Sequence, residues 1–439
     1  MRIHTLGLIT ATLITTILLS ACQTSSGSSR SKQWDYGSSR SKTAESAPRP
    51  LGDIYGENTG AAAARTGVDL SAPTPPQPPI ATTDLPNVKV ALLAPLSGKH
   101  AKLGQSMLNA SQIALFDVGH TNYQLIPLDT RGTPDGARQA AQEASKEGAQ
   151  LILGPLFAES VRAAKPIAAQ SRINMLAFST DWTLAGANTF IMGFLPFDQI
   201  ERLTKYVATN NMNRVGVIAS NDNYGRVVTN AFNSLASRYG LQTITAQNFN
   251  PRSRNLSMDV RSFAKYDTRT DKTAPAPYDA VLMPVGGQTA ITIANLMTQF
   301  DLPPNSVKRL GTGLMDDTGL AGEPGLNGAW FAAPSPNLRR EFEQKYMSTY
   351  ARKPPRIATL AYDATALSAI LAQRGLQNEG RPYFDKNSLM NPNGFFGIDG
   401  IFRFRSDGTA ERGLAILEFS RGRINVIDEA PTTFEQQQY

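Results

Sequence analysis

The sequence predicts an α/β fold made of two lobes, each with a parallel sheet flanked by helices. Two observations support this fold class. Short, almost continuously apolar segments alternate with segments whose apolar residues recur every three to four positions, a pattern typical of buried parallel strands joined by helices. This alternation begins at Val88 and covers about 350 residues, whereas a single hydrophobic core rarely grows beyond about 250–300 residues. We therefore expect two lobes.

The strands are expected where apolar runs lie between turn-forming residues. The first run, VKVALLA at 88–94, ends at Pro95, which has no N–H group to extend a strand ladder. After residue 390, the segments GIFRFRSDG, LAILEFS and GRINVID indicate a smaller group of strands joined by hairpin turns. The remaining strand candidates are 123–128, 150–154, 173–178, 214–220, 278–284 and 307–313.

Helices are expected between most of these strands. In the segment 103–117, the apolar residues Leu103, Met107, Ala110 and Ala114 form a stripe at three-to-four spacing. The other expected helices are 134–148, 159–170, 198–210, 224–239, 287–300, 336–350 and 359–373. Each of these helices can cover one face of a sheet.

The first 22 residues have the pattern of a secretory signal. A basic start is followed by an apolar and hydroxyl-rich segment and by Leu-Ser-Ala-Cys at 19–22. This ending resembles a bacterial lipobox, which implies a signal peptide of residues 1–21 and acylation of Cys22. Gln23, where Asp would favour the inner membrane, resembles the signal for sorting to the outer membrane. An ordinary signal peptide and an uncleaved anchor helix are the alternatives.

Residues 22–87 are expected to be the lipidated cysteine and a disordered tether. The segment is rich in Ser, Gly, Ala and Pro and repeats GSSRSK at 27–32 and 37–42. As a coil it would span about 45 Å. The repeat formally matches the Ser-x-x-Lys motif of penicillin-recognising enzymes, but its low complexity favours no catalytic role. No later apolar run reaches about 18 residues, so no further membrane span is expected.

The composition argues against several classes of function. Cys22 is the only cysteine and only three histidines occur, which leaves no disulfide, Cys/His zinc site or cysteine nucleophile in the folded part. The net charge of +7 is spread along the chain without an interleaved basic and aromatic pattern, so no nucleic-acid partner is expected. The chain lacks Gly-x-Ser-x-Gly, His-Glu-x-x-His and Walker motifs. We expect neither an enzyme nor a cofactor.

Small and polar residues gather where the expected strands end. In open parallel sheets, ligands bind at the carboxyl ends of strands, and two lobes facing each other form a cleft. The same residue types are also required by strand-to-helix turns, so turn geometry is the alternative for each one. The expected cleft residues are Ser97, Gly98, Gly154, Pro155, Leu156, Ser179, Thr180, Trp182, Tyr224 and Gly287.

Two further features near the expected strand ends have competing interpretations. Asp316 and Asp317 could receive a ligand ammonium group, but a helix N-cap before Thr318 is the simpler interpretation. His100 lies beside the first loop, where a surface role is expected because no carboxylate partner is evident.

Four segments, in this order, resemble the type I periplasmic binding proteins, in the branch that binds leucine, isoleucine and valine. They read VALLAPLSGKHAKLGQSMLNASQIALFD, GAQLILGPLFAES, VGVIASNDNYGRVVTNAFNSLASRYG and GIDGIFRFRSDGTAERGLAILEF. The resemblance covers about residues 88–427 and implies three crossovers between the lobes, near 194–198, 332–335 and 377–391. It places lobe one at about 88–196 and 334–380, and lobe two at about 197–333 and 390–439.

Within this family, the lipoprotein signal, LILGPL and AFSTD resemble the LpoA-type activators of penicillin-binding proteins. This implies a lipid-anchored protein on the periplasmic face of the envelope, in the outer membrane, that regulates peptidoglycan synthesis by contacting a penicillin-binding protein. The longer activators also carry an N-terminal helical-repeat domain, whereas this chain has a tether there. The alternative is a substrate-binding lipoprotein of an ABC importer, with an amino acid or another small polar solute, or a peptide, in the cleft.

The resemblance leaves the usual amino-acid clamp incomplete. Where amino-acid binders place a Ser and a Thr in the first lobe, this chain aligns Ala158 and Asp181, and the acidic residue of the second lobe aligns near Gly313. The positions that still match are Ser97-Gly98, Gly154-Pro155-Leu156, Ser179 and Tyr224.

Overall fold

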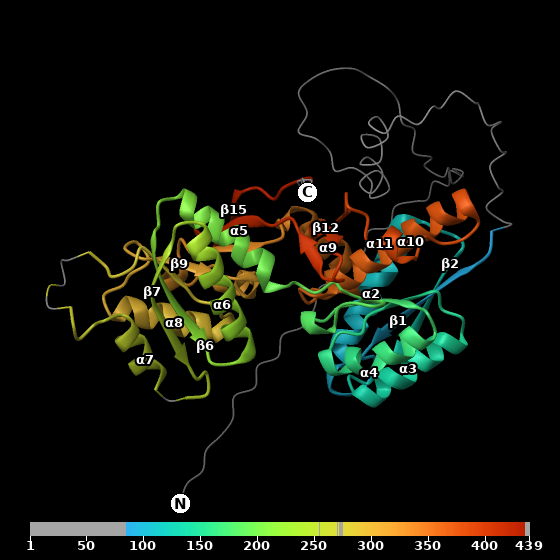
Figure 1. Ribbon diagram of the computed structural model, residues 1–439, viewed down its shortest axis with the longest axis horizontal. Coiled ribbons are helices and arrows are strands. Elements are labelled where there is room, and N and C mark those ends of the chain that lie inside the picture. Colours follow the sequence, from blue (N-terminus) through green and yellow to red (C-terminus); the bar gives the residue numbers. More distant parts are fainter. Residues whose placement is uncertain (1–84, 254, 270, 272–274, 435–439) are drawn as a thin grey trace, which may run out of the picture. The chain divides into compact units, whose positions relative to one another are not determined.

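The computed structural model describes residues 85–434, apart from 254, 270 and 272–274. The predicted signal peptide, Cys22, and the tether with its Ser-x-x-Lys repeats lie outside the described residues. The described chain contains two large sheets, each the centre of an α/β lobe (Figure 1). The predicted α/β fold with two lobes is therefore confirmed. No helix in the described part of the chain is long and apolar enough to cross a membrane.

The first lobe contains a five-stranded parallel sheet in the order β2-β1-β3-β4-β5. Its strands are β1 (Val88–Ala94), β2 (Tyr123–Asp129), β3 (Leu151–Leu153), β4 (Asn174–Ala177) and β5 (Thr189–Ile191). Its helices are α2 (Ala101–Val118), α3 (Pro134–Lys146), α4 (Ala158–Gln170), α9 (Pro336–Tyr350), α10 (Ala358–Glu379) and α11 (Lys386–Leu389), with the 3₁₀ turns η3 (Gly98–His100) and η4 (Trp182–Leu184).

The strand β1 is buried on both faces, as its continuous apolar run predicts. Val90 and Leu92 pack into one cluster with residues of α2 and α10. Ala91 and Leu93 point to the opposite face and pack with residues of α3 and α4. Figure 1 shows these two helix pairs on opposite sides of β1. The alternation places Ala94 at the end of a rigid strand, from which the loop at Pro95 leaves.

The second lobe contains a seven-stranded sheet in the order β15-β14-β10-β9-β8-β6-β7. The five consecutive strands from β10 to β7 are parallel, and β14 and β15 add antiparallel pairs at the opposite edge. The strands are β6 (Arg214–Ser220), β7 (Gln242–Phe249), β8 (Ala280–Leu282), β9 (Lys308–Gly311), β10 (Trp330–Ala333), β14 (Ala415–Ser420) and β15 (Arg423–Asp428).

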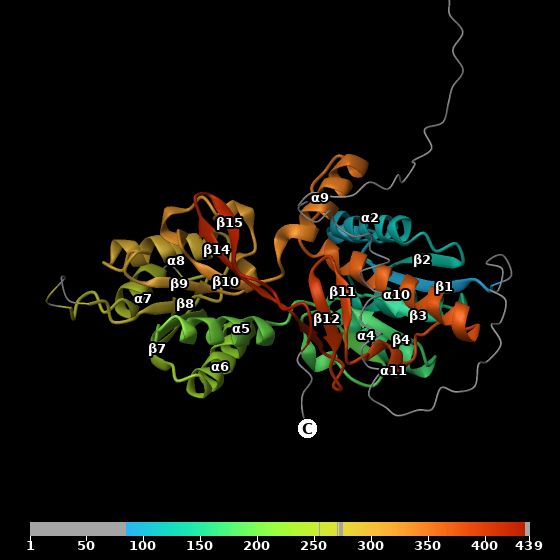
Figure 2. The ribbon, with the colours of Figure 1, turned by 90° about the horizontal axis from the view of Figure 1, so that it is seen from above.

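Helices cover both faces of this second sheet (Figure 2). Val215 and Val217 pack with residues of α5 and α6, whereas Ile218 and Val281 pack with residues of α7 and α8. The helices and 3₁₀ turns are α5 (Pro196–Thr209), α6 (Asn223–Arg238), α7 (Leu256–Phe263), α8 (Gly287–Gln299), η5 (Gly313–Met315), η6 (Thr318–Leu320) and η7 (Pro324–Leu326).

The chain passes between the lobes three times, as the fold class predicts. The first crossing lies between β5 and α5, and the second between β10 and α9. The third lies at 413–414, beyond the expected 377–391, because β11 (Phe395–Gly397), β12 (Gly400–Phe404) and β13 (Ala410–Arg412) form a separate small sheet. Phe402 and Phe404 of this sheet join the core of the first lobe, whereas the sequence prediction assigned 390–439 to the second lobe.

Candidate functional site

The loop after β1 is held by a carboxylate at the end of the neighbouring strand. Asp129 Oδ1 accepts hydrogen bonds from the N–H groups of Leu96 (2.8 Å) and Ser97 (3.1 Å), and Ser97 Oγ donates to Asp129 Oδ2 at 2.5 Å. Burial alone would raise the pKa of Asp129, but these bonds and one from the N–H of Arg131 hold it below its ordinary value. Gly98 follows with φ +75, a left-handed conformation that favours glycine. The predicted cleft residues Ser97 and Gly98 are thus positioned by Asp129, and both are exposed.

The loop after β3 is built by close backbone packing. Gly154 has φ +86, and a Cβ atom there would lie 2.3 Å from the carbonyl oxygen of Leu93. Pro155 accepts a hydrogen bond from the N–H of Phe178 at 2.9 Å, and Leu156 packs at the edge of the first-lobe core. For Gly154, turn geometry accounts for the residue type. The loop leads into α4, whose N-cap Phe157 makes no side-chain capping bond.

The loop after β4 contributes the exposed hydroxyl of Thr180 and the aromatic side chain of Trp182. Ser179 is buried and its Oγ accepts a hydrogen bond from the N–H of Asp181 at 3.0 Å. Asp181 in turn caps η4 by accepting from the N–H of Thr183 at 3.1 Å. Thr180 is exposed. Trp182 packs edge-on against Phe197 of α5, with the ring centroids 4.9 Å apart, so it lies where the first lobe meets the first helix after the crossing.

The two predicted residues of the second lobe differ in whether a group within the protein already occupies them. Tyr224 donates its hydroxyl proton to Thr312 Oγ1 at 3.0 Å, and burial raises its pKa to about 12. Gly287 is exposed and opens α8, whose N-cap Gly286 makes no side-chain capping bond. Tyr224 therefore has an internal partner, whereas the first N–H groups of α8 lack a side-chain acceptor.

The predicted residues follow the carboxyl ends of β1, β3, β4, β6 and β8. Trp182 lies in η4, Tyr224 in the first turn of α6 and Gly287 at the first position of α8. Their hydrogen bonds described above stay within their own lobe, so the structure places two separate polar surfaces, one on each lobe. Among the described residues, no three His, Cys, Asp or Glu side chains are grouped to hold a metal ion.

A charged network at the lobe junction is the main feature that the sequence prediction missed. Asp316 follows η5 in the second lobe, and its side chain is only 2% exposed. Arg339 of α9 donates to both of its carboxylate oxygens, with Nη2 to Oδ1 at 2.9 Å, and Arg356 Nε donates to Oδ2 at 2.7 Å. Burial alone would raise the pKa of Asp316, but the two guanidinium charges hold it below its ordinary value.

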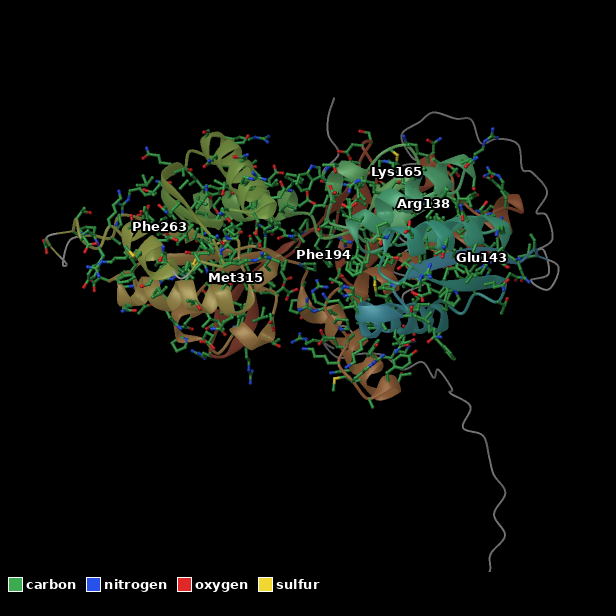
Figure 3. All side chains as sticks on the ribbon, turned by 90° about the horizontal axis from the view of Figure 1, so that it is seen from below. Arg138, Glu143, Lys165, Phe194, Phe263 and Met315 are labelled. Carbon is green, nitrogen blue, oxygen red and sulfur yellow. The ribbon has the colours of Figure 1, made fainter. Side chains whose placement is uncertain are left out.

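The network extends to the first and third crossings. Phe194, labelled in Figure 3 on the first crossing, makes cation–π contacts with the guanidinium groups of Arg356 (4.5 Å to the ring centroid) and Arg412 (4.8 Å). Arg412 Nη2 donates to the carbonyl of Met192 at 2.7 Å, and Arg356 Nη2 pairs with Asp399 Oδ1 at 2.9 Å. These contacts tie the first crossing to segments just before the third.

Asp363 belongs to the same network, because its carboxyl group interacts with the charges of Asp399 and Arg412. The Oδ1 atom of Asp363 accepts a hydrogen bond from the N–H of Ile398 at 2.8 Å, and the side chain is fully buried. Burial and then the charge of Asp399 raise the pKa of Asp363 to about 7. The network thus includes a carboxyl group whose charge depends on pH in the physiological range.

The sequence offered little signal for this network. The partners of Asp316 lie 23 and 40 positions away and belong to the other lobe. Asp317 behaves as the simpler interpretation predicted: its Oδ1 accepts from the N–H of Gly319 at 2.8 Å and caps η6. His100 packs against Phe157 with ring centroids 4.7 Å apart.

Comparisons with known proteins agree with this architecture. A family model described as periplasmic binding protein matches residues 87–423. A search of curated proteins finds no significant match. A structure from Rhodospirillum rubrum, described as a branched-chain amino acid ABC transporter protein, is 18% identical with a TM-score of 0.68, covering 78% of this chain and 100% of its own.

Two other similar structures contain a ligand. The solute-binding protein of an ABC transporter from R. palustris in complex with benzoate is 14% identical, with a TM-score of 0.58 and coverage of 80% of this chain and 98% of its own. The branched-chain amino acid transporter protein LivJ from Streptococcus pneumoniae in complex with isoleucine is 16% identical, with a TM-score of 0.57 and coverage of 79% and 100%. At these identities the structures show the fold. With the family match over most of the chain, they establish that this chain belongs to the periplasmic binding protein family, with the leucine-binding-like type I fold.

Proposed function

We propose that the chain is a non-enzymatic substrate-binding protein of an ABC importer, which holds a small carboxylate-bearing solute between its two lobes. Family membership implies a location outside the cytoplasm. The observation that carries the proposal is the presence of exposed small and polar groups at strand ends of both lobes. Isoleucine and benzoate, the ligands of two similar structures, share a carboxylate group.

Two helix N-termini supply the groups that a carboxylate requires. The helices α4 and α8 begin at these strand ends, and neither has a side-chain cap for its first N–H groups. Free N–H groups and the helix dipole favour an anion at such positions. Thr180 adds a hydroxyl in the first lobe, and Trp182 adds an aromatic surface for the apolar part of the solute.

The structure favours a carboxylate without an α-amino group. Asp181, which aligns where amino-acid binders place a Thr, is occupied in capping η4. Tyr224 donates its hydroxyl to Thr312. Asp316, which could have received an ammonium group, is enclosed by Arg339 and Arg356. With these groups engaged elsewhere, an aromatic or aliphatic acid fits the site better than an amino acid.

A second candidate function is regulation of peptidoglycan synthesis through contact with a penicillin-binding protein, from an outer-membrane lipid anchor at Cys22. The buried network of Asp316, Arg339 and Arg356 favours this candidate, because it links the lobes at their junction. A fixed arrangement of lobes suits a docking module better than a receptor that must open and close. The anchor and the partner remain predictions from the sequence.

Thermal unfolding with defined solutes separates the two candidates. We expect benzoate or 3,4-dihydroxybenzoate to raise the unfolding temperature more than leucine or isoleucine. A ligand at 100 times its Kd adds about 2.7 kcal/mol to the free energy of unfolding. If none of the four raises the midpoint and a penicillin-binding protein co-purifies with the whole chain from envelope extracts, the regulator is the better account.

A further inference from the structure

A cavity lies at the junction of the lobes. Its volume is about 570 Å³, which falls within the range of small-molecule sites, about 300–1,000 Å³. The second lobe contributes Asp316–Thr318 and the turn between β14 and β15, and the first lobe contributes the start of α9 and the segment before α10. None of the predicted cleft residues lines this cavity, so it is separate from the strand-end site.

The lining of this junction cavity is positively charged. Five cationic side chains face three carboxylates, namely Arg339, Arg340, Lys353, Arg356 and Arg423 against Asp316, Asp317 and Glu343. These cations come from α9, the segment before α10, and β15, so their gathering is a product of the fold. The sequence shows no basic run.

Three of the five cations have carboxylate partners within the protein. Arg339 and Arg356 share Asp316, as described above. Lys353 Nζ lies 3.8 Å from Glu343 Oε2. These groups hold the wall of the cavity in place and contribute little free charge.

Arg340 and Arg423 are different. Both are exposed, and neither pairs with a carboxylate in the described part of the chain. The Nη2 of Arg340 donates a hydrogen bond to the amide oxygen of Asn337, at 2.6 Å. Arg340 is the fifth residue of the 15-residue helix α9, whereas the helix dipole favours cations near the C-terminus. Helix stability therefore does not explain the basic residue at position 340.

We propose that the junction cavity binds a small molecule with two anionic groups, carboxylate or phosphate, which pair with Arg340 and Arg423. Guanidinium groups suit this role because their planar set of donors matches either anion in a bidentate arrangement. Arg340 belongs to the first lobe and Arg423 to the second, so the bound anion bridges the lobes. Its binding favours the lobe arrangement described here. This proposal goes beyond the strand-end site and does not depend on which solute that site binds.

The test uses the whole chain and two dianionic probes, inorganic pyrophosphate and glutarate, with acetate at matched ionic strength as the singly charged control. Calorimetric titration should show saturable binding of at least one dianion and none of acetate. Arg340→Gln and Arg423→Gln should each weaken that binding at least about tenfold, since a hydrogen bond to a charged group is worth about that much. Arg421→Gln should leave it unchanged, because Arg421 lies in the same turn but does not line the cavity.

Three results would overturn the proposal. The first is that neither dianion binds at millimolar concentration. The second is that the Arg340→Gln and Arg423→Gln variants bind the dianion as tightly as the wild type. The third is that Arg421→Gln weakens binding as much as those two variants do, which would indicate general ionic attraction. Circular dichroism checks that each variant is folded. A benzoate response that persists in Arg340→Gln while pyrophosphate binding is lost separates this site from the strand-end site, and failure of either proposal leaves the other intact.

Discussion

Asp316 is the residue at which the electrostatics of the lobe junction can be tested most simply. Asp316→Asn leaves the guanidinium groups of Arg339 and Arg356 facing a neutral amide at a buried position. Removing one partner of a buried ion pair typically costs about 3–5 kcal/mol. We expect a loss of that order in the free energy of unfolding, measured by urea denaturation with a two-state fit.

The neighbouring residue provides the matched control. Asp317→Asn changes an exposed carboxylate that caps the short turn η6. The amide oxygen of Asn can accept the same N–H of Gly319, so a loss of about 1 kcal/mol or less is expected. Equal losses for the two variants would show that Asp316 has no special role in the junction.

Because its pKa is raised in the folded chain, Asp363 should make the free energy of unfolding decrease as pH rises. Its pKa is about 7 in the folded chain against an ordinary value of 3.8. Between these values the folded state holds a proton that the unfolded chain has released, so stability falls as pH rises from about 4 to about 7, by at most about 1.4 kcal/mol per pH unit.

Asp363→Asn removes this titration while keeping an oxygen for the N–H of Ile398. We expect the free energy of unfolding of this variant, measured by urea denaturation at several pH values, to change less between pH 4 and pH 7 than that of the wild type. Parallel pH profiles for the two proteins would contradict the assigned protonation of Asp363.

At the scale of elements, α2 packs so closely against the end of β1 that no side chain fits at Gly104. A Cβ atom on Gly104 of α2 would lie 2.1 Å from the carbonyl oxygen of Pro95, at the end of β1. Gly104→Ala should therefore destabilise the chain by about 1–3 kcal/mol, as overpacking does, despite the better helix propensity of Ala. Gly322→Ala, where a Cβ atom meets nothing within 4 Å, should change the midpoint of thermal unfolding little. Similar shifts for both variants would refute this packing argument.

The elements that the sequence predicted best were those with strong, continuous patterns. The run at 88–94 became β1 with the same bounds, and the stripe from Leu103 to Ala114 lies within α2. The strands β5 and β10 were not predicted, although β3, β4, β8 and β9 are equally short and lie within predicted strands, so length alone does not explain the omission. The strand β7 was missed because its side chains are mostly exposed and polar, as at a sheet edge.

The third crossing shows a different limit of sequence patterns. The apolar alternation in GIFRF and in LAILEFS predicts strands equally well. Their sheets differ because Phe402 and Phe404 pack into the first-lobe core, whereas Leu417 and Phe419 pack into that of the second lobe. Which sheet each strand joins depends on contacts with residues far away in the sequence, and a local apolar pattern does not predict such contacts.

For the whole molecule, the sequence predicted which residues lie near the strand ends, but it did not predict the hydrogen-bond partners of those residues. The rule that polar residues follow parallel strands placed Ser97 and Ser179 in loops, as observed, and Tyr224 just beyond β6, where it lies in the first turn of α6. It could not show that Ser97 bonds to Asp129 or that Tyr224 bonds to Thr312, because these contacts join residues 32 and 88 positions apart. The junction network was missed for the same reason. The ligand contacts of the strand-end residues therefore remain a proposal.

Calorimetric titration of benzoate and 3,4-dihydroxybenzoate into the whole chain shows directly whether the chain binds a carboxylate-bearing solute. We expect saturable binding of at least one of these acids to a single site. We further expect at least about tenfold weaker binding in Trp182→Ala, which removes the aromatic surface, and unchanged binding in Arg340→Gln. Absence of binding by both acids, or binding that Trp182→Ala leaves unchanged, would contradict a solute site between the lobes.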